Sequence, residues 1–277
     1  MFIRLGYEIE FHVPAPVPML LLLHTLPDRD ADLRHPDRLR ITPDVPVTQF
    51  LDTFGNRCSR IVAPAGTLRL CSDFMIEDPG VTLPLVTNAE QHPVQDLPTE
   101  CLPFLLPSRY CESDRLSDAA WDLFGDGPTG WGRVQAVCDW CFGNVEFGYP
   151  YANKTKTAND VYEDRKGVCR DFTHLAISFC RALNIPARYA TGYLGDIGVP
   201  TDVNPMDFSA CFQAYLGGRW HLFDARHNIR RVGWVLMATG RDAADCALTT
   251  SFGPTTLTKF LVHADVVPTP DLDSPRC

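Results

Sequence analysis

The chain has 277 residues, of which 45% are hydrophobic and 21% are charged, a balance that is typical of soluble globular proteins and leaves room for two domains. Its formal net charge of −9 comes without a stretch rich in lysine and arginine, which argues against nucleic acid as a partner. The longest purely apolar run, residues 19–23, is too short to cross a bilayer, so we expect no membrane partner.

The first half of the chain carries patterns of β-strands at residues 4–13, 18–24, 58–63 and 67–77, separated by Pro, Gly, Asn and Asp. This spacing favours an antiparallel β domain, which we place at residues 1–90. Proline-containing segments follow, and we expect residues 91–115 to be a packed linker. Helical patterns then indicate an α+β domain at residues 116–265, with residues 266–277 left as a polar, frayed tail.

Cysteine usage and the start of the chain bear on the compartment. Eleven cysteines form an odd set in a chain too large to need disulfides, so we expect reduced thiols. The first residues lack the basic segment, apolar run and cleavage site of a secretory signal. Both observations predict a cytoplasmic location.

Residues 131–142 form a helical pattern that places Val134, Val137, Cys138 and Cys141 on one face. The two cysteines superficially resemble a redox or zinc pair. No second Cys-x-x-Cys and no His-x-x-x-His pair completes a tetrahedral zinc site, so we interpret them as core residues. We therefore expect neither a metal nor another cofactor.

Cys169 begins a strongly periodic helix that runs to about residue 183. The unpaired N–H groups and the positive end of the helix dipole favour a thiolate there and supply donors for an oxyanion. Arg165, Lys166 and Arg170 could add positive charge. From position alone, a structural cysteine remains the alternative.

Several sequence blocks resemble the signature of bacterial transglutaminase-like proteins. They are Gly167-Val168-Cys169-Arg170-Asp171, RALNIPARY at 181–189, GYL at 192–194 and FSACFQAYLGGRWHLFD at 208–224. The resemblance implies a papain-like fold with a catalytic Cys, His and Asp, in which Cys169 is the nucleophile and Asp224 the aspartate. It also implies that residues 230–252 belong to the same domain. At the position of the catalytic histidine, however, this chain has Ser209.

Gly217 and Gly218 predict a two-residue hairpin turn. Counting outward from this turn, Ser209, Cys211 and Asp224 project from the same face of the hairpin. The hairpin therefore predicts that Asp224 and the position of the missing histidine share a site.

Serine cannot accept a proton near neutral pH as imidazole does, and the first possibility is that another histidine serves as the base. His227 is our preferred base, provided that the chain turns after Asp224, which Asn228 favours. His174 lies five residues after the nucleophile, roughly 140° around the helix. His221 should face away from the site.

We therefore expect cysteine-dependent acyl transfer on a peptide or amide substrate, with hydrolysis favoured over cross-linking. Cys169 attacks the carbonyl carbon, helix-start N–H groups hold the oxyanion, and Asp224 orients the base. Two alternatives stay open: a thiolate whose proton is carried by water or substrate, and a non-catalytic binding or scaffold protein. A metal-dependent hydrolase ranks last, because the chain has no His-Glu-x-x-His motif. Substrate and oligomeric state stay open.

Overall fold

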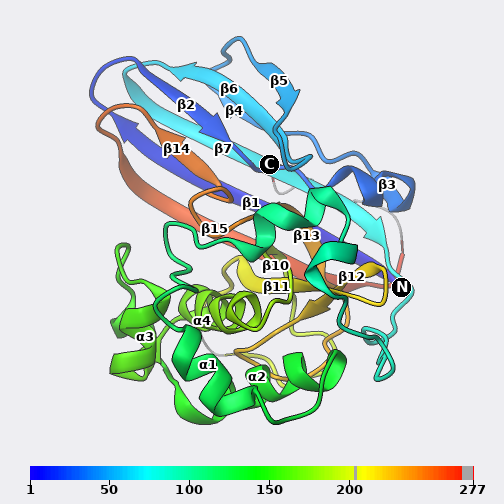
Figure 1. Ribbon diagram of the computed structural model, residues 1–277. Coiled ribbons are helices and arrows are strands. Elements are labelled where there is room, and N and C mark those ends of the chain that lie inside the picture. Colours follow the sequence, from blue (N-terminus) through cyan, green and yellow to red (C-terminus); the bar gives the residue numbers. More distant parts are fainter. Residues whose placement is uncertain (203–204, 270–276) are drawn as a thin grey trace.

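The computed structural model describes residues 1–202, 205–269 and 277 (Figure 1). The strands are β1 (Phe2–Val13), β2 (Val17–Leu21), β3 (Leu33–His35), β4 (Arg40–Thr42), β5 (Thr48–Leu51), β6 (Arg57–Ala63), β7 (Gly66–Glu77), β8 (Glu146–Phe147), β9 (Lys166–Gly167), β10 (Ala187–Tyr193), β11 (Ser209–Leu216), β12 (Arg219–Phe223), β13 (Val235–Gly240), β14 (Thr249–Ser251) and β15 (Thr256–Val267). The α-helices are α1 (Ser117–Phe124), α2 (Trp131–Asn144), α3 (Ala158–Asp164) and α4 (Cys169–Ala182). Short 3₁₀ segments are η1 (Pro27–Asp32), η2 (Val94–Asp96), η3 (Thr99–Leu105) and η4 (Tyr149–Tyr151).

The three larger sheets are antiparallel. Two consist of N-terminal strands joined by one strand from near the C-terminus, and the third consists of β10 to β13 alone. One has the order β15-β1-β7-β3, with β4 also paired to β7, and another has the order β14-β2-β6-β5. A further sheet has the order β12-β11-β10-β13 and lies between the first two and the helices (Figure 1). The α+β class predicted from the sequence is confirmed.

The N-terminal strands enclose a core because their apolar residues alternate. Residues of β1, β2, β6 and β7 that point inward form one buried cluster, which includes Ile3, Leu5, Tyr7, Met19, Leu21, Ile61, Leu70 and Phe74. The strands predicted at residues 4–13, 18–24, 58–63 and 67–77 are present as these four elements. Tyr193, Val235 and Met237 of β10 and β13 belong to the same cluster, so the β region and the third sheet share one core.

The last strand differs from the division of the chain made above. β15 was assigned partly to the α+β region and partly to the tail, but it pairs with β1 along its length, from Phe2 opposite Val267 to His12 opposite Thr256. The physical reason is that β7 pairs with only one edge of β1. Without β15, the N–H and C=O groups of the other edge would be unpaired. Of the predicted tail, residues 270–276 lie outside the described residues. The boundaries near residues 90 and 115 stay predictions.

Helix α4 packs against the other three α-helices and against β10 and β11 of the third sheet. Phe172, Leu175 and Phe179 are buried in a cluster with Ala210 and Phe212 of β11. The buried face of α2 joins the same cluster, which confirms the interpretation of its two cysteines as core residues. Phe172, near the start of α4, is thereby packed in one core with Ala210, near the start of β11.

All eleven cysteines lie in the described part of the chain, and they correct one expectation. Cys71 of β7 forms a disulfide with Cys277, while the other nine are free. The expectation of reduced thiols is therefore wrong for this pair, whose 206-residue separation hides it from local patterns. No helix of the described residues is long and apolar enough to cross a membrane.

Candidate active site

Cys169 is the first residue of α4, and its neighbours hold the helix start in place. A carboxylate oxygen of the buried Asp171 accepts the N–H of Val168 at 3.0 Å, and the other oxygen accepts Arg170 Nη2–H at 3.1 Å. A Cβ on Gly167 would lie 2.6 Å from the Cβ of Asp171, so this approach requires glycine. The thiol is thus presented at the N-terminus of a fixed helix.

Asp224 directly follows β12 and organises the turn that the sequence predicts. Its Oδ1 accepts the backbone N–H groups of Arg226 and His227, both at 3.0 Å, and its Oδ2 lies 2.7 Å from Nδ1 of His227. Asn228 closes the turn with a φ of 53°. One buried carboxylate therefore sets both the backbone of the turn and the ring of the histidine.

The Asp224 contact determines which nitrogen of His227 is protonated. A carboxylate only accepts hydrogen bonds, so in the neutral ring Nδ1 carries the hydrogen and donates a hydrogen bond to Asp224. In this tautomer Nε2 has a lone pair that can accept a proton. The exposed fraction is 23% for the His227 side chain and 3% for that of Asp224, so the ring screens the carboxylate while reaching solvent itself.

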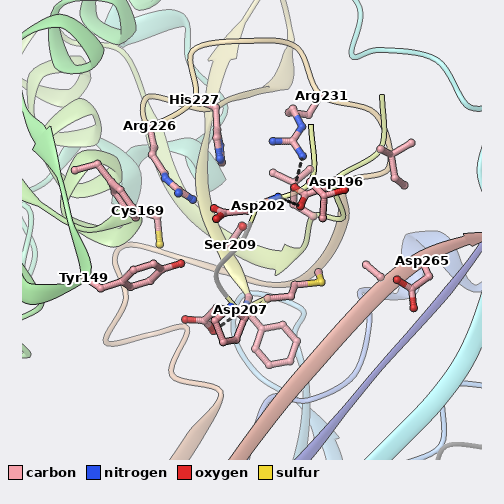
Figure 2. A pocket seen from close by; sticks show the side chains of 18 of the residues that line it. Tyr149, Cys169, Asp196, Asp202, Asp207, Ser209, Arg226, His227, Arg231 and Asp265 are labelled. Atoms are coloured by element: carbon pink, nitrogen blue, oxygen red, sulfur yellow. Dashed lines mark hydrogen bonds and ion pairs between the residues drawn. The ribbon is translucent and has the colours of Figure 1, made fainter. Parts of the chain in front are cut away.

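Cys169, Ser209, Arg226 and His227 line one pocket of about 460 Å³ (Figure 2). The remaining walls come from several segments: Tyr149 from η4, Asp196, Asp202 and Asp207 from the segment after β10, Arg231 from the segment after β12, and Asp265 from β15. Cys211, which the hairpin count placed on the same face as Ser209, is fully buried with Ala190, Leu194 and Trp234 and does not line the pocket. The structure therefore brings Cys169, Ser209 and His227 to one pocket, with Asp224 behind His227.

The electrostatics of Cys169 differ from the expectation of a stabilised thiolate. Burial raises the pKa of the thiol, and the charge of Asp207 raises it further. The backbone N–H groups of Ala210 and Arg170 and the charge of Arg226 lower the pKa, but by less than burial raises it. The thiol therefore needs a proton acceptor to react near neutral pH.

The basic residues expected to favour the thiolate have other partners. The guanidinium of Arg165 lies 4.3 Å from the ring centres of Trp140 and Tyr162. The amine of Lys166 lies over the ring of Tyr151. The guanidinium of Arg170 is held by Asp171. The charge that lowers the pKa of Cys169 comes from Arg226, which was not among the basic residues expected to do so.

The other two histidines considered above lie elsewhere. His174 is fully buried, stacks on Tyr110 at 5.0 Å between ring centres, and accepts the N–H of Ala243; burial places its pKa well below the usual value. His221 contacts the carbonyl oxygen of Leu216 at 3.1 Å. Neither lines the pocket of the nucleophile.

Most residues that line the pocket were not predicted as part of the site, and Arg226, Tyr149 and Asp207 are examples. Arg226 stands between two residues that were singled out, so the Asp-Ala-Arg-His turn was an available signal. Tyr149 comes from the short 3₁₀ segment η4 and Asp207 from the irregular segment before β11, and the sequence analysis identified no motif in either. Among the described residues, no three His, Cys, Asp or Glu side chains are placed to hold a metal ion.

Comparisons with known proteins agree on a family. The model of the transglutaminase-like superfamily matches residues 122–225. The crystal structure of a candidate cysteine protease from Cytophaga hutchinsonii is 36% identical, with a TM-score of 0.82 over 99% of this chain and 93% of that chain. The periplasmic domain of TgpA from Pseudomonas aeruginosa, 15% identical over 81% of this chain and 90% of that chain, has a TM-score of only 0.41 and supports no argument.

A curated relative, the uncharacterised protein ML0607 of Mycobacterium leprae, is 29% identical over 118 residues. This match spans 41% of the present chain and 42% of the length of the relative. Two findings support the family assignment. The similarity to the Cytophaga structure covers nearly the whole chain, and the residues matched by the family model include Cys169 and Asp224. The chain belongs to the transglutaminase-like superfamily.

Proposed function

We propose that the protein is a cysteine-dependent acyl-transfer enzyme that hydrolyses peptide or amide bonds through a thioester on Cys169. The observation that carries the proposal is the contact of His227 Nδ1 with Asp224, which leaves Nε2 free in the pocket of the thiol. A histidine oriented by a carboxylate is the arrangement that cysteine and serine nucleophiles use to lose their proton.

In the proposed reaction, Nε2 of His227 takes the proton of Cys169, and the thiolate attacks the carbonyl carbon of the substrate. Backbone N–H groups at the start of α4 stabilise the oxyanion. The C–N bond then breaks, and the imidazolium gives its proton to the leaving amine. Water, deprotonated by the same imidazole, attacks the thioester, which releases the carboxylic acid and restores the thiol.

Ser209 takes no part in proton transfer in this proposal, because a hydroxyl cannot serve as a base near neutral pH. It lines the pocket at the start of β11. His227 approaches from the turn after β12 instead, so the base comes from a different strand end than the resemblance implies.

A second candidate function is a non-catalytic binding protein of peptides or amides. Two observations favour it: burial raises the pKa of Cys169, and no hydrogen bond joins its sulfur to His227 among the described residues. In this case, the pocket would hold its ligand without forming a thioester.

Acyl-enzyme formation decides between the two functions. A p-nitrophenyl ester is mixed with the protein, the released nitrophenolate is followed, and the site of acylation is found by mass spectrometry. We expect acylation on Cys169, its loss in Cys169→Ala, a decrease of at least about 100-fold in His227→Ala, and little change in Ser209→Ala. His12→Ala, a change of an exposed histidine on β1, is the matched control. Unchanged acylation in His227→Ala would refute the base, and no acylation of Cys169 would favour the binding function.

The proposal includes a peptide or amide as partner and neither nucleic acid nor a membrane. Location in the cytoplasm stays a prediction from the sequence. The disulfide between Cys71 and Cys277 is a feature of oxidising compartments and counts against it. Cell fractionation, with the disulfide assayed in the fraction that holds the protein, tests the location.

A further inference from the structure

Two arginines line the pocket, Arg226 and Arg231, and in the described part of the chain only the guanidinium of Arg226 lacks a hydrogen-bond acceptor. Within the described residues, its guanidinium makes no hydrogen bond and no ion pair, whereas Arg231 of the same pocket is buried and bonded to the carbonyl oxygen of Gly195 and to Asp196. The guanidinium of Arg226 lies over the ring of Phe147, 3.8 Å from its centre. Figure 2 shows it pointing into the pocket that also receives the sulfur of Cys169 and the ring of His227.

Both ends of Arg226 are held in position. Its backbone N–H donates to Asp224, in the same turn that places His227. The ring beneath its guanidinium is fixed relative to the nucleophile, because Phe147 of β8 pairs with Gly167 of β9, two residues before Cys169. A planar cation stacked on a ring keeps the N–H groups at its edge free, so the guanidinium is preorganised to bind a further group.

The pocket is lined by charges of both signs. The charge of Arg226 lowers the pKa values of Cys169 and Tyr149, while Asp207 raises both. The carboxylates of the pocket come from the segment after β10, with Asp196, Asp202 and Asp207, and from Asp265 of β15. The region next to the sulfur therefore combines a free guanidinium with the nucleophile.

We propose that Arg226 binds a carboxylate of the substrate next to the acyl carbon that Cys169 attacks. A guanidinium binds a carboxylate with two parallel N–H···O bonds, an arrangement that neutral amides do not match. The inference rests on the proposed function and narrows its substrates to peptides or amides that carry a carboxylate near the scissile bond. The carboxylate is either the free end of a peptide or an acidic side chain.

Alkylation with matched reagents tests this without a known substrate. N-iodoacetylglycine carries the carboxylate of a chain end, N-iodoacetyl-aspartic acid α-amide carries only a side-chain carboxylate, and N-iodoacetylglycinamide is neutral. The rate constant for Cys169 is measured with each reagent by mass spectrometry. The ratio of anionic to neutral reagent cancels the thiolate fraction, so a change in the pKa of the thiol does not alter it.

We expect at least one anionic reagent to be favoured over the neutral one, relative to the same ratio at a cysteine of the unfolded chain. Arg226→Gln should lower this ratio by at least about tenfold, the loss of a charge-assisted pair, and Arg226→Lys should fall in between because it keeps the charge without the fork. Arg230→Gln, an equal charge change at an exposed residue outside the pocket, should leave the ratio unchanged. The favoured reagent identifies the source of the carboxylate.

An unchanged ratio in Arg226→Gln would overturn the inference, including the case in which only the pH profile with the neutral reagent moves. In that case Arg226 acts on the thiolate alone. Circular dichroism checks that the variants are folded, and Arg226→Lys provides a second measurement if the Gln variant is not. If no reagent labels Cys169 faster than an unfolded cysteine, the proposed function fails, and this inference fails with it.

Discussion

Asp224→Asn and Asp224→Ala separate two roles of one carboxylate. The buried side chain accepts the N–H groups of Arg226 and His227 on one oxygen and the Nδ1–H of His227 on the other. Alanine removes all three acceptor contacts. Asparagine keeps one oxygen for the backbone donors but places an amide where the ring needs an acceptor.

The magnitudes follow from these contacts. A hydrogen bond to a charged group contributes about 1.5–3 kcal/mol, and because water can reach the half-buried donors, we expect Asp224→Ala to lower the free energy of unfolding by about 3 kcal/mol in total. This corresponds to a decrease in Tm of roughly 6–12 °C in a chain of this size. Asp224→Asn should lose about 1 kcal/mol, because the backbone bonds remain.

In Asp224→Asn, activity should be affected far more than stability. In Asp224→Asn, the amide NH₂ faces Nδ1 of His227 and favours the tautomer with its proton on Nε2, which cannot accept the proton of Cys169. Acylation should therefore fall by roughly 10²–10⁴-fold although the fold is nearly intact. Thermal unfolding followed by circular dichroism and the ester burst measure the two effects. Wild-type acylation in a folded Asn variant would refute the argument that Asp224 orients a base.

Other outcomes follow from the same geometry. At neutral pH, iodoacetamide should label Cys169 faster in the wild type than in His227→Gln, and the rates should converge above the raised pKa of the thiol, where it ionises unaided; parallel profiles at all pH values would contradict a base role. Gly167→Ala should lower Tm and slow labelling, because its Cβ would lie 2.6 Å from the Cβ of Asp171, and a melt like that of the wild type would contradict this close contact. Titration of denatured, unreduced protein should find nine free thiols, whereas eleven would exclude the disulfide.

Features that depend on neighbours in sequence could be predicted. The alternation of residues 67–77 gives β7, and the apolar period that follows Cys169 gives α4. The glycine pair predicts the hairpin, and Leu216 lies opposite Arg219 as the turn requires. These features need only the local backbone preferences and the alternation of apolar with polar residues.

Features that depend on distant segments could not be predicted. The pairing of β1 with β15 and the disulfide of Cys71 join segments more than 200 residues apart. The pKa of Cys169 was misjudged for the same reason, since burial raises it and the pocket around the thiol is lined by segments distant in sequence, such as residues 194–209 and 264–266. Arg226 could have been found, because it lies in a turn whose other members were already assigned.

The position of β15 has a consequence for the order of events during synthesis. Ala264 and Val266 line the pocket of the nucleophile, and their strand is held by β1 from the beginning of the chain. A contact of such high sequence separation forms late, and a ribosome must release residue 267 before the strand can pair. Until β15 pairs with β1, Cys169 and His227 therefore lie in a pocket that lacks one of its walls. The complete pocket forms only after β15 has paired, so a nascent chain lacks the wall that this strand contributes.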